Sequence, residues 1–155
     1  MNDNNYDIYS RCIIRSVNHI FKKFLGCEEI EEIFETQSNS MDPQVAVEID
    51  GTICGEIIIN LPINTLDLIT GKFINSKDKN KLRMHHSDVA GELANLITGT
   101  LANQLQYIDH EVSLSPPEFN DDPISIKAIY DNINISFCSS YGGFDVDFYY
   151  REDEY

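Results

Sequence analysis

The chain has 155 residues, of which 42% are hydrophobic and 24% are charged, proportions typical of a folded globular protein with one sizeable core. Its 26 acidic and 11 basic side chains give a net charge of −15. Such a charge disfavours nucleic acids and anionic membranes as partners, because both need basic patches. It suits a partner with a positive rim, although it can also simply serve solubility.

The sequence predicts a cytoplasmic protein that forms one domain over residues 1–155. No segment approaches the length of about 18 apolar residues that a membrane-spanning helix needs. Because the first nine residues are polar, they are not expected to act as a signal peptide. Four cysteines lack CxxC spacing and are expected to be reduced thiols; they are Cys12, Cys27, Cys54 and Cys138.

The N-terminal part is predicted to begin with a long helix. Apolar residues recur every three or four positions over Tyr6 to Leu25, and Gly26 is a suitable helix stop. The acidic segment Glu28 to Glu35 could extend the helix, but its position favours an edge strand. Polar residues Gln37 to Pro43 are expected to form a loop.

Two β-rich segments follow, Gln44 to Glu48 and Thr52 to Leu61. Asp50-Gly51 between them is a strong hairpin signal. Gly55 inside the second segment indicates a bulge or a close approach of another backbone.

A short helix is predicted over Asn64 to Thr70, with Pro62 at its start. Its inward side chains are expected to be Leu66, Ile69 and Phe73. The next residues, Gly71 to Lys81, are predicted to be a lysine-rich connection. His85 and His86 are placed in a loop, where adjacent side chains point in different directions, so no metal site is expected there.

The main helix is predicted over Asp88 to Ile108, with Ser87 or Asp88 as its cap. At about 100° per residue, its apolar residues form one broad stripe that can pack on a sheet; they are Ala90, Leu93, Ala94, Ile97, Leu101, Leu105 and Ile108. The opposite stripe lacks Lys and Arg, unlike a helix face that is merely solvated. It consists of Glu92, Asn95, Gly99, Asn103 and Gln106.

Strands are predicted to dominate the remainder of the chain. His110 to Leu114 is a short strand, and residues 118–123 form an acidic loop. Ile124 to Tyr130 and Ile133 to Cys138 are predicted to form a hairpin through Asp131-Asn132. A last strand covers Phe144 to Tyr150, after a turn at residues 141–143.

The order of helix, strand and hairpin occurs twice, which indicates a duplicated unit. We therefore predict an α+β fold, with a pseudo-duplicated antiparallel sheet and two long helices packed on one face.

The segment Glu92 to Gly99, ELANLITG, resembles the Glu-x-x-Asn-x-x-x-Gly signature of the CheC/CheX chemotaxis phosphatases. Ala46 to Leu61 and Val112 to Pro117 resemble the family's segments on either side of it. Aligning the helix ends puts Tyr9 and Cys12 opposite Glu92 and Asn95, so the first half lacks the signature. This is similar to CheX, which has one site per chain, rather than CheC, which has two.

The resemblance implies hydrolysis of the aspartyl phosphate on a CheY-type response regulator, whose receiver domain holds Mg²⁺; no cofactor of its own is expected. Such a reaction needs a well-placed water, and the amide of Asn95 can accept from a water and donate to a phosphoryl oxygen. An exposed carboxylate is a weak base, so Glu92 is assigned an ion pair with the receiver's lysine.

Flanking residues are predicted to contact the regulator, with Gly99 allowing close approach; they are Leu96, Gly99, Asn103 and Gln106. Thr100 differs from the Asn that the family often has there. The resemblance also implies a homodimer formed through sheet edges, for which the C-terminal strands are candidates. The alternative function is a non-catalytic CheC-like module that docks on a response regulator or a flagellar switch component.

Overall fold

A computed structural model describes residues 3–120 and 130–152. In this part of the chain the helices are α1 (Asp3–Phe24), α2 (Ile63–Ile74) and α3 (Lys79–Gln106). The strands are β1 (Ile30–Ile33), β2 (Gln44–Gly51), β3 (Ile53–Asn60), β4 (Val112–Leu114), β5 (Glu118–Asn120), β6 (Asp131–Ser139) and β7 (Gly142–Glu152).

The strands form one antiparallel sheet in the order β1-β6-β7-β3-β2-β4, with β5 also paired to β2. The order is pseudo-symmetric: β1 and β4 are the outermost strands of this order, β6 and β2 lie next to them, and β7 and β3 lie at the centre. Each half therefore contributes a long helix, a short outer strand and a central hairpin. The predicted duplicated α+β fold is confirmed.

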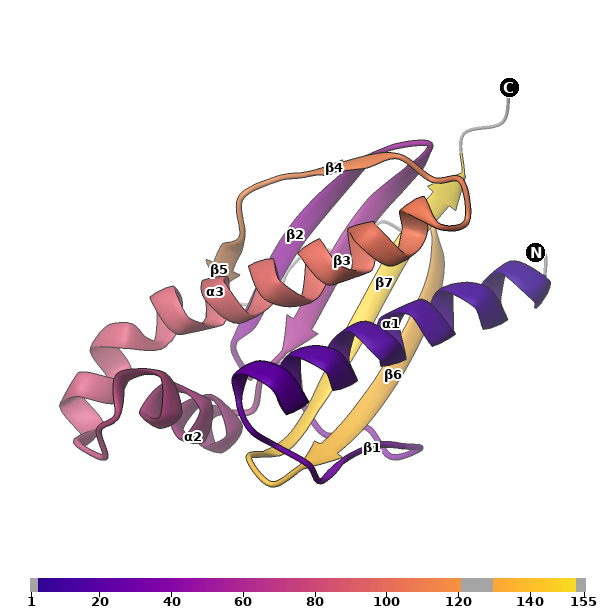
Figure 1. Cartoon of the computed structure of the whole chain (residues 1–155). Helices are drawn as coiled ribbons and strands as arrows, with labels where there is room; N and C mark the ends of the chain where they lie inside the picture. Colours follow the sequence, from indigo (N-terminus) through magenta and orange to yellow (C-terminus); the bar gives the residue numbers. More distant parts are fainter. Residues whose placement is uncertain (1–2, 121–129, 153–155) are drawn as a thin grey trace.

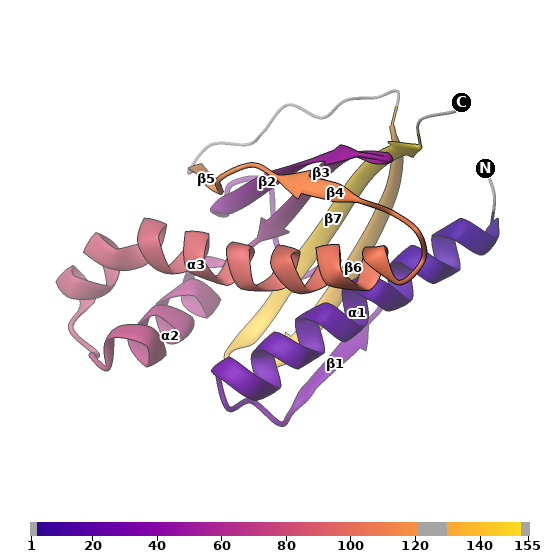
Figure 2. The ribbon, with the colours of Figure 1, turned by 45° about the horizontal axis from the view of Figure 1, so that its top comes forward.

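Helices α1 and α3 lie across the same face of the sheet, and α2 packs beside the first turns of α3 (Figures 1 and 2). The core lies between these helices and the sheet. In β7, alternate residues point into it, as the sequence pattern predicts; they are Phe144, Val146, Phe148 and Tyr150. The ring of Phe144 stacks between those of Phe21 from α1 and Phe137 from β6, at 4.8 and 5.1 Å between centroids.

The N-terminal predictions hold closely. Helix α1 ends before Gly26, whose φ of +62° gives a left-handed stop, and the Cys27 N–H donates to the Phe21 carbonyl. The segment after α1 forms edge strand β1. A Cβ at Gly55 would collide with the carbonyl oxygen of Tyr149, so a close backbone approach explains this glycine.

The predicted start of the main helix was wrong by nine residues. Helix α3 begins at Lys79, and the Asp78 side chain caps it by accepting from the N–H groups of Asn80 and Lys81. Leu82 and His86 extend its buried stripe toward the N-terminus. The helix therefore includes the end of the expected lysine-rich connection and both histidines.

Helix α2 also runs further than predicted, ending where Asn75 takes a left-handed conformation with φ of +52°. Leu66 and Ile69 are buried as expected, but Phe73 is 37% exposed and does not point inward.

Two C-terminal predictions were wrong. Asp131 and Asn132 do not form a turn, because they pair with Tyr150 and Tyr149 as the first residues of β6. Residues 118–120 form strand β5 rather than a loop, and pair with β2. Most of the predicted strand over Ile124 to Tyr130 lies outside the described residues.

The C-terminal strands do not offer the sheet edges expected of them. Strand β6 lies between β1 and β7, and β7 lies between β6 and β3. The edges are formed by β1 on one side and by β4 and β5 on the other. Within the described residues, no helix combines the length and the apolar character that crossing a membrane requires.

Candidate functional site

The polar stripe of α3 faces away from the sheet because the opposite face of the helix is buried. All but one of the predicted apolar residues are buried, and Ile108 is partly buried against the core; the buried ones are Ala90, Leu93, Ala94, Ile97, Leu101 and Leu105. This packing fixes the rotation of the helix and turns Glu92 and Asn95 outward.

Both Glu92 and Asn95 are exposed. Neither side chain has a hydrogen-bond or ion-pair partner among the described residues, so both are available to a molecule from outside. They line one cavity of about 280 Å³ on the surface of α3. The other lining residues are Ser87, Asp88, Gly91, Pro117 and Phe119.

The far wall of this cavity comes from the segment after α3. Pairing of Phe119 with Val45 holds β5 on β2, and this pairing brings Pro117 over the helix. A Cβ added at Gly91 would lie 3.4 Å from Cγ of Pro117, at the near limit of ordinary van der Waals contact. The sequence pattern did not identify this wall, because the pairing of β5 with β2 is not local.

Asp88 was predicted only as a possible cap, but it is an exposed helical residue that lines the cavity. It lies four residues before Glu92, so the two carboxylates occupy neighbouring positions on one face. The four-residue spacing of Asp88 and Glu92 would have indicated that they share a face, had the predicted helix begun before Asp88.

The predicted flanking residues lie along the same stripe but do not share one cavity. Leu96 is half-buried and packs against the core, while Asn103 and Gln106 are exposed and line a separate cavity of about 200 Å³. A Cβ at Gly99 would meet nothing within 4 Å. Packing inside this chain therefore does not require glycine at this position.

Thr100 uses its hydroxyl inside the helix, donating to the carbonyl of Leu96 at 2.9 Å. The hydroxyl hydrogen of Thr100 is therefore used within the helix. The longer side chain of an asparagine would place its amide farther from the helix backbone.

In the first half of the chain, Tyr9 and Cys12 are both buried, and burial raises the pKa of the Cys12 thiol. They therefore form no counterpart to the exposed pair on α3.

The two histidines flagged by the sequence are helical, contrary to the predicted loop. His86 is buried, and its Nε2 lies 2.6 Å from Oδ1 of Asp67, which joins α3 to α2. Over residues 3–120 and 130–152, no group of three or more His, Cys, Asp or Glu side chains could hold a metal ion.

Structural comparison places this arrangement in the CheX/CheC-like fold. The protein in the CheX–CheY–BeF3–Mg²⁺ complex from Borrelia burgdorferi shares 20% identity at a TM-score of 0.79, over 93% of this chain and 98% of that one. The chemotaxis protein CheX from Desulfovibrio desulfuricans shares 16% identity at 0.77, over 92% and 99%. The FliM middle domain from H. pylori shares 7% identity at 0.62, over 97% and 93%.

At the level of sequence, the family model described as "Chemotaxis phosphatase CheX" matches residues 43–127. The chain belongs to the CheX family. A search of curated proteins gave no match.

Proposed function

We propose that this protein hydrolyses the aspartyl phosphate of a CheY-type response regulator, with Asn95 orienting the attacking water. The observation that carries the proposal is the exposed, unpartnered amide of Asn95 on α3, one turn from an equally free carboxylate. Membership of a family of chemotaxis phosphatases supports the same reaction.

Asn95 suits this role because its amide can both accept and donate a hydrogen bond. Its carbonyl oxygen would accept from the water, and its NH₂ would donate to a phosphoryl oxygen. The packed face of α3 holds the backbone at this position, so part of the positioning entropy is met before the partner arrives.

Glu92 would pair with the lysine of the receiver domain and set the position of Asn95 over the phosphorylated aspartate. Leu96, Gly99, Asn103 and Gln106 would extend this contact along about 20 Å of helix. A complex of CheX with CheY in Borrelia burgdorferi supports a CheY-like partner. The receiver would supply Mg²⁺, and the protein would need no cofactor of its own.

The experiment is phosphate release from a phosphorylated receiver domain with Mg²⁺, with and without this protein. Wild type should accelerate release, and Asn95→Ala should not, while binding to the receiver is retained. Asn80→Ala is the matched control, because Asn80 is exposed on the same helix but lies outside the cavity. Equal acceleration by wild type and Asn95→Ala would end the proposal.

The alternative is a docking module without catalysis. The likeness to the FliM middle domain supports keeping this alternative, because a protein that carries another name shares the fold and a fold does not by itself imply an activity. A docking module would bind the receiver and change its affinity for other targets, while phosphate release stayed at the receiver's own rate.

We also propose that the protein acts in the cytoplasm as a homodimer. Within the described residues the sheet ends at β1 on one side and at β4 and β5 on the other, and a second copy could add strands there. Light scattering tests this: a mass of one chain at micromolar concentration would exclude the dimer.

A further inference from the structure

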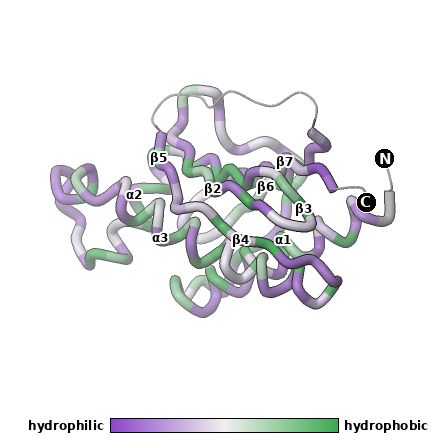
Figure 3. Tube along the Cα trace, turned by 90° about the horizontal axis from the view of Figure 1, so that it is seen from above, coloured by the Kyte–Doolittle hydropathy of each residue, from purple (hydrophilic) through white to green (hydrophobic). Residues whose placement is uncertain are grey.

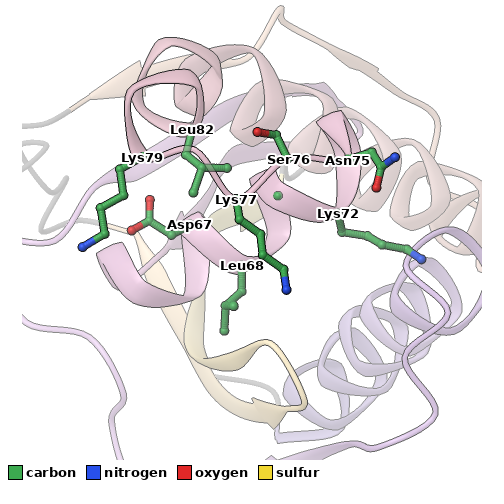
Figure 4. Close-up of a pocket in the computed structure, with 9 residues that line it drawn as sticks. Asp67, Leu68, Lys72, Asn75, Ser76, Lys77, Lys79 and Leu82 are labelled. Carbon is green, nitrogen blue, oxygen red and sulfur yellow. The ribbon is translucent and has the colours of Figure 1, made fainter.

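A groove between α2 and the start of α3 lies outside the candidate site. Its volume is about 810 Å³. Apolar side chains of Leu68 and Leu82 line it together with the exposed lysines Lys72, Lys77 and Lys79. Figure 4 shows the three lysines spreading from different directions around Leu68.

The segment that forms this groove is positively charged, although the whole chain is negatively charged. Residues 67–83 contain five basic and two acidic side chains, for a net charge of +3, whereas the rest of the chain carries −18. Figure 3 shows the connection between α2 and α3 as a hydrophilic segment at one end of the molecule.

The lysines have no carboxylate partner within the described part of the chain, where the only ion pair joins His86 to Asp67. Two acids lie in this segment: Asp67 lines the groove and contacts His86, and Asp78 caps α3; neither forms an ion pair with these lysines. In a protein with 26 acidic residues, clustered lysines without such partners leave a localised positive charge open to a ligand.

The groove also exposes apolar surface. Leu68 is 55% exposed although it sits at the centre of α2, and Leu82 forms part of the opposite wall. A ligand that fits would therefore combine negative charge with an apolar side chain, as a peptide segment containing glutamate or aspartate does. A nucleic acid or an anionic membrane would also be repelled by the rest of the chain, which carries a net charge of −18.

We propose that this groove is a docking site for a short acidic peptide segment of a partner protein, with one apolar side chain of the segment against Leu68. Its position separates it from the candidate site. Leu82 and Glu92 are ten residues apart, which corresponds to about 80° around the helix and about 15 Å along it. A peptide in the groove would leave Glu92 and Asn95 accessible, and the inference does not rest on the proposed function.

The test is fluorescence anisotropy with a short labelled peptide of glutamates around a single phenylalanine. Wild type should bind it saturably. Charge reversal at all three lysines, Lys72→Glu, Lys77→Glu and Lys79→Glu, should weaken binding by about tenfold or more, since it replaces three attractive contacts with repulsive ones. Leu68→Ser should weaken it by about threefold or more.

A matched control reverses three exposed charges on α1, Arg11→Glu, Arg15→Glu and Lys22→Glu, and should change the affinity by less than about twofold. It gives the same net charge as the groove variant, so it separates local contact from the overall field. Circular dichroism checks that every variant is folded.

Several results would overturn the proposal. These are no saturable binding, equal weakening in the α1 control, and unchanged binding in Leu68→Ser. Equally tight binding of a glutamine version of the peptide would also overturn it. So would preferential binding to anionic vesicles, or self-association that the groove variant abolishes, because another occupant would then fill the groove.

Discussion

Gly99 offers a test that separates folding from function, because the fold does not require it. It lies in the interior of α3, where glycine costs about 1 kcal/mol relative to alanine. A Cβ there would meet nothing within 4 Å in this chain. Gly99→Ala should therefore stabilise the protein by about 0.5–1 kcal/mol, or about 2–4 °C in Tm.

The same substitution should impair contact with the receiver domain. If Gly99 lets the partner approach the backbone of α3, a methyl group would hold the two surfaces apart and shift Asn95 from its position over the phosphate. We expect Gly99→Ala to raise KM for the phosphorylated receiver, with a smaller loss in kcat.

Urea denaturation measures the stability, and phosphate release over a range of receiver concentrations measures KM. Gly91→Ala is a useful comparison, because its Cβ would lie 3.4 Å from Pro117 rather than in open space, and this close contact should offset part of the gain in stability. A more stable Gly99→Ala with unchanged kinetics would refute the close-approach argument. A less stable Gly99→Ala would refute the packing argument.

Two further predictions concern stability. Asp145 is 1% exposed and accepts hydrogen bonds from the backbone N–H groups of Gln37 and Ser38. Asp145→Ala should therefore lower the free energy of unfolding, measured by urea denaturation, by about 3 kcal/mol. A loss below about 1 kcal/mol would contradict this role. Burial is the larger cause, and the hydrogen bond to Glu152 the next, of a Tyr9 pKa far above its usual 10.0. Because Tyr9 then ionises at lower pH in the unfolded chain than in the folded protein, the stability falls as pH rises through about 10. Tyr9→Phe should lose about 1 kcal/mol at pH 7 and show a smaller alkaline loss, and an unchanged slope would contradict this assignment.

The sequence predicted the duplicated architecture because each half repeats strong local signals. Helical periodicity, the Asp50-Gly51 hairpin and the alternation in the last strand all act over a few residues. The outward position of Asn95 followed from the same periodicity, since the residues beside it, Leu93 and Ala94, must be buried.

What the sequence missed depends on non-local packing. The first two turns of α3 contain only two buried residues, Leu82 and His86, which is too few to give a clear helical periodicity. The lysine-rich sequence around them therefore resembled that of a loop. The groove beside α2 and the wall formed by Pro117 and Phe119 exist only once distant segments are brought together. Pairing of Asp131 with Tyr150 likewise overrides a local turn signal.

The most direct test of the central claim is steady-state phosphate release at increasing receiver concentration for wild type, Asn95→Ala and Glu92→Gln. If Asn95 orients the water, Asn95→Ala should lower kcat by about 100-fold or more and leave KM within about threefold. Glu92→Gln should mainly raise KM, because it weakens the ion pair that aligns the partner. An Asn95→Ala variant that keeps kcat, or that loses activity only through KM, would contradict the account.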